Sequence, residues 1–402
     1  MVDVPAVGRV TPVSPAQAAE IALAEYGLAG TAERLASEHD DTFRLAGADG
    51  VPRLMKISVV PDLLAGTSGL PLPASPGVTA GEAPGFQTAL LLHLERVAPE
   101  LPVQRVIAAL GGRPEILLTL SDGEPRLVRM TSWLDGQPLG RGTSSLGLRR
   151  EIGATLARLN IALRGFAHPG ARRTHLWDLQ NFVALRPLLD ELPESGMLPS
   201  VSRALTATGL TAGGSREFAA GGLRATLADC LDRFDAMVRP ALAGVPTQAI
   251  HTDFHGDNLL TDGSGRIVGI LDFGDALDGP VAMDVGVAAC YQLGGYGADG
   301  LDGARGDVLG PALDVVAGYH AVDSLPTMDL DLMAELIVAR VATRIIVSQV
   351  NAVREPANSG YLLRRTPTAI TQFVALRGFP PGEIARRLRA ACGIEEVAEG
   401  VQ

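Results

Sequence analysis

Residues Gln248 to Gly286 contain the side chains whose types and spacing could do chemistry. Asp253 is followed five positions later by Asn258, then by a short apolar run, a tight turn and a second apolar run that ends at Asp272. Because an antiparallel hairpin brings its first and last residues side by side, we expect Asn258 and Asp272 to meet at one end. Their amide and carboxylate oxygens suit Mg²⁺, and Asp253 is expected within reach as a base or orienting group. This set predicts phosphoryl transfer, which depends on positioning and on cancelling negative charge.

Lys56 is the only lysine of the chain, which has 33 arginines. An excess of Ala, Gly and Arg is typical of GC-rich coding, so the scarcity of lysine alone indicates no function. Lys56 lies in RLMKIS, a stretch typical of a strand. A compact ammonium can lie between the α- and β-phosphates of a nucleotide, where a planar guanidinium does not fit without rearrangement. We therefore interpret Lys56 as a phosphate-binding residue.

The elements before residue 134 predict a small antiparallel sheet with one main helix. Ser14 and Pro15 begin a first helix, which ends before Gly27, and Pro84 begins the main helix. Alternating apolar residues and turn signals predict strands over residues 32–37, 42–45, 53–59, 103–110, 116–120 and 126–133. Residues 61–85, which are rich in Pro, Gly, Ser and Ala, predict a long mobile loop.

Long helices dominate from Leu139 onward and are expected over residues 145–164, 176–192, 222–241, 281–292, 308–319, 329–352 and 380–391. Residues 249–273 interrupt them with strand-like sequence, and residues 196–222 are typical of a second flexible insertion. The connection SWLDGQPLG predicts a hinge. We expect an α+β, bilobal protein, with an N-lobe over residues 1–133 and a larger, mostly helical C-lobe over residues 134–402.

The composition excludes several classes of function. The net charge is −11, without a basic run and with few aromatic residues, so nucleic acid is not an expected partner. An acidic surface favours a cationic small molecule. Three widely spaced cysteines, Cys230, Cys290 and Cys392, fit free thiols of a reducing compartment. With no signal-like start and no apolar run of about 18 residues, we expect a cytoplasmic monomer or homodimer that does not bind membranes.

The chemistry-bearing stretch also resembles a known family. The pattern H-x-D-x-x-x-x-N followed by DFG, with a single strand lysine upstream, is similar to the aminoglycoside phosphotransferase (phosphotransferase enzyme) family of the protein-kinase-like fold. Within that family the chain most resembles hydroxylysine kinases and the kinase domains fused to class III aminotransferases. The matching stretches run from about residue 15 to residue 393 and include ASEHDDTFRL, LMKIS, HTDFHGDNLL, GILDFGDALDGPVAMDVGVAACYQL and YLLRR.

The resemblance implies a role for each matched residue. Asp253, on a catalytic loop over residues 249–258, would be the catalytic residue. Asn258 and Asp272, the latter in the DFG of residues 272–274, would be the magnesium ligands. Lys56 would hold the phosphates of ATP or GTP.

Further residues are implied around the nucleotide and the catalytic loop. Ser37 would lie over the phosphates, and the backbone of Met130, Thr131 and Trp133 would contact the purine. His251 and Asp284 would have structural roles, with Asp284 bracing the catalytic loop.

Two departures from the family pattern concern the nucleotide side. Gln87 occupies the helix position where a glutamate normally pairs with the strand lysine. We therefore expect either that an amide hydrogen bond between Gln87 and Lys56 replaces this ion pair, or that Glu82 provides the carboxylate. The turn SEHDD also lacks the glycines of a phosphate-binding loop.

The resemblance implies an acceptor that is a hydroxylated amino acid or an amino alcohol, so the partner is an amine-bearing small molecule. Arg344, on a long helix, is a candidate for binding a free carboxylate of such an acceptor. The other candidate acceptor-site residues are His255, Asp257, Asp275, Trp177, Asp178 and Tyr361.

Several alternatives stay open at this point. An aminoglycoside or other antibiotic is another acceptor. A catalytically silent nucleotide-binding module is a different class, and so is a metallohydrolase that uses His251, Asp253 and His255. A protein substrate is disfavoured, because only about eight residues separate Asp272 from the helix near Val281, too few for an activation segment.

Overall fold

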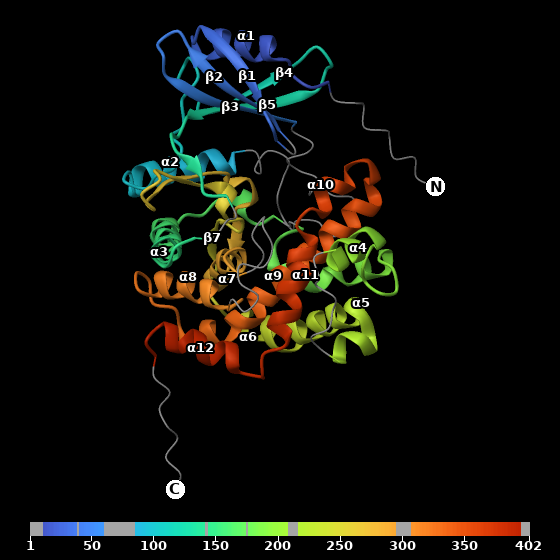
Figure 1. Ribbon diagram of the computed structural model, residues 1–402. Coiled ribbons are helices and arrows are strands. Elements are labelled where there is room, and N and C mark those ends of the chain that lie inside the picture. The colour runs from blue at the N-terminus through green and yellow to red at the C-terminus, as the bar shows by residue number, and fades with distance from the viewer. Residues whose placement is uncertain are drawn as a thin grey trace. The chain divides into compact units, whose positions relative to one another are not determined.

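A computed structural model describes residues 11–37, 40–59, 85–140, 144–173, 176–207, 216–294 and 307–394 (Figure 1). The predicted loop over residues 61–85 lies outside them except for Gly85, and Glu82 lies outside them too. The chain divides into two compact units. The first comprises Met1–Asp135, Phe166–Leu176 and Val268–Gly274, and the second comprises Gly136–Gly165, Trp177–Ile267 and Asp275–Gln402.

The first unit is built on a five-stranded antiparallel sheet with the order β1-β2-β3-β5-β4. Its strands are β1 (Gly30–Leu35), β2 (Asp41–Gly47), β3 (Pro52–Val59), β4 (Ile116–Thr119) and β5 (Pro125–Ser132). The first three form the predicted meander. The strand predicted over residues 103–110 is wrong. Only two isolated bridges form there, Val103 with Ile270 and Val106 with Thr131, so the two ends meet different elements and no ladder extends.

One face of this sheet carries helix α1 (Pro15–Tyr26), as Figure 1 shows. Ser14 caps the helix as predicted, because its hydroxyl accepts from Gln17 N at 3.2 Å and Gln17 Oε1 accepts from Ser14 N at 2.9 Å. The shared apolar core contains Ala18, Ile21, Ala22, Tyr26, Phe43, Leu45, Met55, Ile57, Val128 and Met130. Burial of this face fixes the register of the sheet.

The opposite face of the sheet carries the polar side chains. Side chains alternate along a strand, so Lys56 lies between Met55 and Ile57 but points the other way. Arg129 of β5 is its cross-strand partner. Helix α2 (Phe86–Val97) lies on this side, since its Gln87 accepts a hydrogen bond from Arg129. Two cationic side chains are therefore next to each other on the face that bears the single lysine.

The second unit is mostly helical. It contains α3 (Leu146–Leu163), α4 (Pro199–Ala207), α5 (Arg216–Arg233), α6 (Arg239–Leu242), α7 (Val281–Tyr291), α8 (Gly310–His320), α9 (Thr327–Arg354), α10 (Ser359–Leu363), α11 (Thr366–Arg377) and α12 (Glu383–Ala391). Most of α9 is buried, because α7, α10, α11 and α12 all contact it (Figure 1). None of the helices in the described part of the chain has the length and apolar composition needed to cross a membrane.

The predictions for three parts of the chain require correction. Residues 196–222 are not a flexible insertion throughout: α4 forms there with Val201 buried, and Leu198 N donates to Gln349 Oε1 at 2.9 Å. The helix predicted over residues 176–192 is a 3₁₀ helix, Leu179–Glu191, with Pro187 inside it. Because proline has no N–H to donate, it does not support an α-helix there. Helices α10 and α11 were not predicted.

Short strands lie where the sequence predicts them around residues 249–273. Strand β7 (Gln248–Ile250) pairs antiparallel with β10 (Leu277–Gly279), and β8 (Leu259–Thr261) pairs antiparallel with β6 (Gln137–Pro138). The predicted turn after β8 is closed by a hydrogen bond from Asp262 N to Arg266 O at 3.3 Å. Strand β9 (Ile267–Ile270) then leads to Asp272. These elements place Asp253 and Asn258 at the ends of buried strands.

Candidate active site

The backbone at Thr252 is strained and presents Asp253. Thr252 has φ of 62°, a conformation that β-branched residues rarely adopt. The carboxylate of Asp284, fully buried on α7, accepts from Thr252 N at 2.8 Å and from His251 N at 3.1 Å. Thr252 Oγ1 also donates to Asp275 O at 2.7 Å. The bracing of this loop that was expected of Asp284 is therefore observed, and it offsets the local strain.

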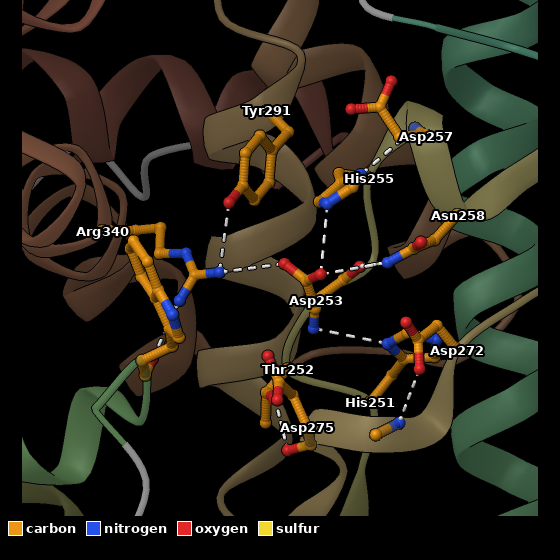
Figure 2. A network of polar contacts seen from close by, with 12 residues as sticks. His251, Thr252, Asp253, His255, Asp257, Asn258, Asp272, Asp275, Tyr291 and Arg340 are labelled. Carbon is orange, nitrogen blue, oxygen red and sulfur yellow. Dashed lines mark hydrogen bonds and ion pairs between the residues drawn. The ribbon is translucent and has the colours of Figure 1, made fainter. Parts of the chain in front are cut away.

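Both carboxylate oxygens of Asp253 are held by donors (Figure 2). Arg340 Nη2 lies 3.1 Å from Oδ1, whereas Asn258 Nδ2 and His255 Nε2 lie 3.0 and 3.1 Å from Oδ2. The Asp253 side chain keeps 23% of its surface exposed. The carboxylate thus has a fixed orientation and remains accessible to another molecule.

The hydrogen bonds of His255 define its tautomer. His255 Nδ1 accepts from Asp257 N at 3.1 Å, so the proton of the neutral ring is on Nε2, which donates to Asp253. Burial alone would raise the pKa of Asp253, but the hydrogen bond from His255 and the guanidinium of Arg340 hold that pKa well below its usual range. Asp253 is therefore an ionised acceptor of hydrogen bonds.

Arg340 is a site residue that the sequence reasoning missed. Its side chain is 1% exposed, and its guanidinium donates to Tyr291 Oη at 3.1 Å and to Trp177 O at 2.8 Å as well as to Asp253. It also lies over the rings of Trp177 and Tyr291, at 5.1 and 5.4 Å from their centroids. Arg340 thereby ties α9 and the C-terminal end of α7 to the carboxylate.

Asn258 in the second unit and Asp272 in the first unit each carry an oxygen of the kind that Mg²⁺ prefers. Asn258 Nδ2 donates to both Asp253 O and Asp253 Oδ2 at 3.0 Å, which turns the amide oxygen the other way. In the first unit, Asp272 has φ of 57° and accepts from Lys56 Nζ at 3.2 Å and from Gly274 N at 3.1 Å.

The same region does not provide the ligands of a hydrolase metal centre. Among the residues that the structure describes, no three or more His, Cys, Asp or Glu side chains are arranged to hold a metal ion. His251 Nδ1 accepts from Asp253 N, and His255 faces Asp253 through Nε2. The metallohydrolase alternative with His251, Asp253 and His255 as ligands is therefore wrong.

A pocket in the first unit surrounds Lys56. It is lined by Leu54, Lys56, Gln87, Thr88, Leu91, Gln104, Val106, Arg129, Met130, Thr131, Asp272 and Phe273. Two cations and one carboxylate among these residues leave a positive balance, which favours an anion. The expected amide hydrogen bond, which Lys56 Nζ would donate to Gln87, does not form. Gln87 Oε1 instead accepts from Arg129 Nη1 at 2.7 Å, and Lys56 pairs with Asp272.

The other predicted nucleotide residues lie on strand β5 or just after a strand. Ser37 is exposed just after β1. Met130 O accepts from Ile107 N at 2.9 Å, and Ser132 N donates to Arg105 O at 2.8 Å, so these backbone groups are already paired. Thr131 lines the pocket, and the ring of Trp133 stacks on Arg44 at 5.0 Å.

The predicted acceptor residues fall into two groups. His255, Trp177 and Arg344 gather around Tyr291 and Arg340, and Asp257 lies next to His255 with an ion pair to Arg365 at 3.7 Å. Asp178 instead caps the 3₁₀ helix by accepting from Gln180 N and Asn181 Nδ2. Tyr361 is half exposed on α10, and the guanidinium of Arg364 lies over its ring. The carbonyl of Asp275 accepts the hydrogen bond from Thr252 Oγ1.

The sequence of this chain is similar to those of known proteins. The sequence profile of the Phosphotransferase enzyme family matches residues 31–323. Hydroxylysine kinase of Danio rerio is 23% identical over 391 residues, which are 93% of this chain and 94% of that protein. The enzyme of Mus musculus is 23% identical over 281 residues, which are 66% of this chain and 65% of that protein.

Solved structures show the same fold. A microcompartment-associated aminopropanol kinase matches with a TM-score of 0.55 and 16% identity, covering 94% of this chain and 99% of that one. A spectinomycin phosphotransferase matches with a TM-score of 0.52 and 12% identity, covering 95% and 99%. The expected α+β, protein-kinase-like fold is confirmed. The family profile covers well over half of the residues, so this chain belongs to the Phosphotransferase enzyme family and is a phosphotransferase.

Proposed function

We propose that this protein is a Mg²⁺-dependent kinase that transfers the γ-phosphoryl group of ATP or GTP to a hydroxyl of an amino alcohol or a hydroxylated amino acid. The observation that carries this proposal is the environment of Asp253. Its ionised carboxylate is oriented by Arg340, His255 and Asn258 and is still accessible. Such a group suits the positioning of an attacking hydroxyl.

In this proposal Asp253 accepts a hydrogen bond from the acceptor hydroxyl and aims its oxygen at the phosphorus. Its lowered pKa makes it a weak base, so it is suited to orienting the alcohol and to taking the proton late in the transfer. A loose, metaphosphate-like transition state requires little proton removal before the bond to the leaving group breaks. Orientation by fixed donors then contributes more than basicity.

The nucleotide is assigned to the first unit. The positive balance around Lys56 and Arg129 supports phosphate binding, and the partly exposed apolar residues Leu54 and Val106 offer a surface for a purine. Because Met130 O and Ser132 N are already paired, we assign the backbone contact with the purine to Trp133. Asn258 and Asp272 would hold Mg²⁺, which when bound neutralises charge on the phosphate oxygens.

The acceptor class is supported by the relatives. Hydroxylysine kinase and aminopropanol kinase are named for alcohols that also carry an amine, and the chain has a net charge of −11, which favours a cationic acceptor. An antibiotic acceptor is the second candidate, since spectinomycin phosphotransferase and amicoumacin kinase share the fold at TM-scores of 0.52 and 0.55.

The test is nucleotide consumption by the purified protein with a panel of hydroxy-amines, hydroxylated amino acids and aminoglycosides, with ATP or GTP and with or without Mg²⁺. We expect turnover with one or more of the first two classes, and loss of turnover on chelation of Mg²⁺. Turnover with aminoglycosides alone would favour the second candidate. Absence of turnover with every acceptor, in protein that binds nucleotide, would instead indicate the silent nucleotide-binding module.

A further inference from the structure

Two arginines of α9 contact the same tyrosine. Arg340 and Arg344 are one helical turn apart, and their guanidinium carbons lie 5.4 and 5.1 Å from the ring centroid of Tyr291 at the end of α7. Stacking on an aromatic ring fixes the plane of each guanidinium. The two arginines share an anchor, but their remaining contacts differ.

The guanidinium of Arg340 is used within the protein. It donates to Asp253, to Tyr291 Oη and to Trp177 O, and its side chain is buried. Arg340 therefore positions the carboxylate of Asp253, and its guanidinium is not available to bind a ligand.

Within the described ranges, the guanidinium of Arg344 has no partner comparable to Asp253. Its polar contact is a thiol, Cys290 Sγ at 3.9 Å from Nη1, and a thiol sulfur is a weak acceptor. Across the described part of the chain, no carboxylate lies within 4.0 Å of it. Two other arginines of α9 do have carboxylate partners: Arg340 pairs with Asp253, and Arg354 pairs with Glu191 at 2.6 Å. Among the residues that the structure describes, the charge of Arg344 is thus left without a counterion.

The position of Arg344 relates it to the site of chemistry. Arg340 and Arg344 are four residues apart, so their side chains begin about 6 Å apart along the same face of α9. Both guanidinium groups contact the ring of Tyr291, and the ring of His255, the donor to Asp253, is 4.8 Å from the ring of Tyr291. Contacts through Tyr291 and His255 therefore connect Arg344 to Asp253. Arg344 is half-buried, so its planar pair of donors is held in place but is not enclosed.

We propose that Arg344 binds a carboxylate of the acceptor, which makes the acceptor a hydroxylated amino acid and not an amino alcohol. The inference rests on the proposed function, because it concerns the molecule whose hydroxyl Asp253 orients. A guanidinium matches a carboxylate with two parallel, charge-assisted hydrogen bonds. An amino alcohol without the carboxylate would leave this cation unpaired, and discrimination follows from that difference.

The experiment uses acceptors that differ only in the carboxylate. Threonine is compared with 1-aminopropan-2-ol, and 5-hydroxylysine with 1,5-diaminopentan-2-ol, in the wild type and in Arg344→Gln, Arg344→Lys and Arg354→Gln. Arg354 is the matched control, since it lies on the same helix and its ion pair is at the surface. Loss of charge-assisted hydrogen bonds predicts a 10- to 100-fold rise in KM for the amino acid in Arg344→Gln. Arg344→Lys should give a smaller rise, and Arg354→Gln none.

In the same variants, KM for the amino alcohol and for the nucleotide should stay unchanged. Equal use of both members of each pair by the wild type, or equal loss with both in Arg344→Gln, would overturn the inference and leave the kinase activity standing. No nucleotide consumption with any acceptor would overturn the proposed function, and this inference with it.

Discussion

Replacement of Arg340 by methionine tests how Asp253 is held. Methionine preserves much of the apolar stem but removes a buried cation that hydrogen-bonds to Asp253, Tyr291 and Trp177. Breaking a buried pair from one side costs about 3 to 5 kcal/mol. Since His255 and Asn258 still hold the other oxygen of Asp253, we expect a loss of unfolding free energy near 3 kcal/mol, the lower end of that range.

The catalytic effect follows from the lost orientation of the carboxylate. A hydrogen bond to a charged group contributes about 1.5 to 3 kcal/mol, which corresponds to roughly a 10- to 150-fold fall in kcat. The measurements are urea unfolding and steady-state nucleotide consumption, with Arg354→Met as the control. That control breaks a surface ion pair, for which about 0 to 1 kcal/mol is expected. If Arg340→Met matched the control in both stability and kcat, the positioning role of Arg340 would be refuted.

Arg340→Met should also shift the dependence of kcat on pH. The folded-state pKa of Asp253 is lowered, so its ionisation stabilises the fold above the ordinary aspartate pKa of about 3.9, and that stability is lost as pH falls through the folded value. Burial raises the pKa of Asp253 and the guanidinium of Arg340 lowers it, so the pKa rises when the guanidinium is removed. The acid limb of the kcat profile should therefore move to higher pH in Arg340→Met. Superimposable profiles would contradict this account of the Asp253 environment.

Two further substitutions address the nucleotide side and the catalytic loop. Lys56→Arg should weaken nucleotide binding about 10-fold or more, because the larger planar group does not reproduce the contact of Nζ with Asp272 at 3.2 Å, and titration with nucleotide would detect it. An unchanged nucleotide affinity would contradict the interpretation that the site requires the compact ammonium of Lys56. Gly256→Ala would place a Cβ 1.7 Å from Gly140 O, so we expect about 1 to 3 kcal/mol of destabilisation and reduced kcat; a fully stable, fully active variant would argue against this close approach.

The elements that could be predicted from sequence have local signals. Alternating apolar residues and turn residues located β1 to β5, and the Ser14 cap located the start of α1. Residues 103–110 have the composition of a strand, but their pairing depends on two distant elements, which no local pattern reveals. The 3₁₀ helix at Leu179–Glu191 depends in the same way on packing, and here Pro187 was the available signal.

The candidate site was predictable only where spacing along the chain fixes it. Asp253 and Asn258 belong to one loop, and their hydrogen bond follows from that spacing. Arg340 lies 87 positions from Asp253 and is one of two arginines one turn apart on α9, so the sequence does not distinguish the buried arginine from the half-buried one. The bond of Gln87 to Arg129 was missed for a similar reason, because cross-strand register places that arginine beside Lys56.

The central claim is that Asp253 acts on the acceptor whereas Asp272 acts on the metal-bound nucleotide. The direct measurement compares Asp253→Asn and Asp272→Asn for nucleotide affinity with and without Mg²⁺ and for phosphoryl transfer in a single turnover. We predict that Asp253→Asn binds nucleotide with Mg²⁺ like the wild type but transfers no phosphoryl group. Asp272→Asn should lose the Mg²⁺-dependent part of nucleotide affinity. Wild-type transfer by either variant, or Mg²⁺-dependent binding that survives in Asp272→Asn, would contradict the account.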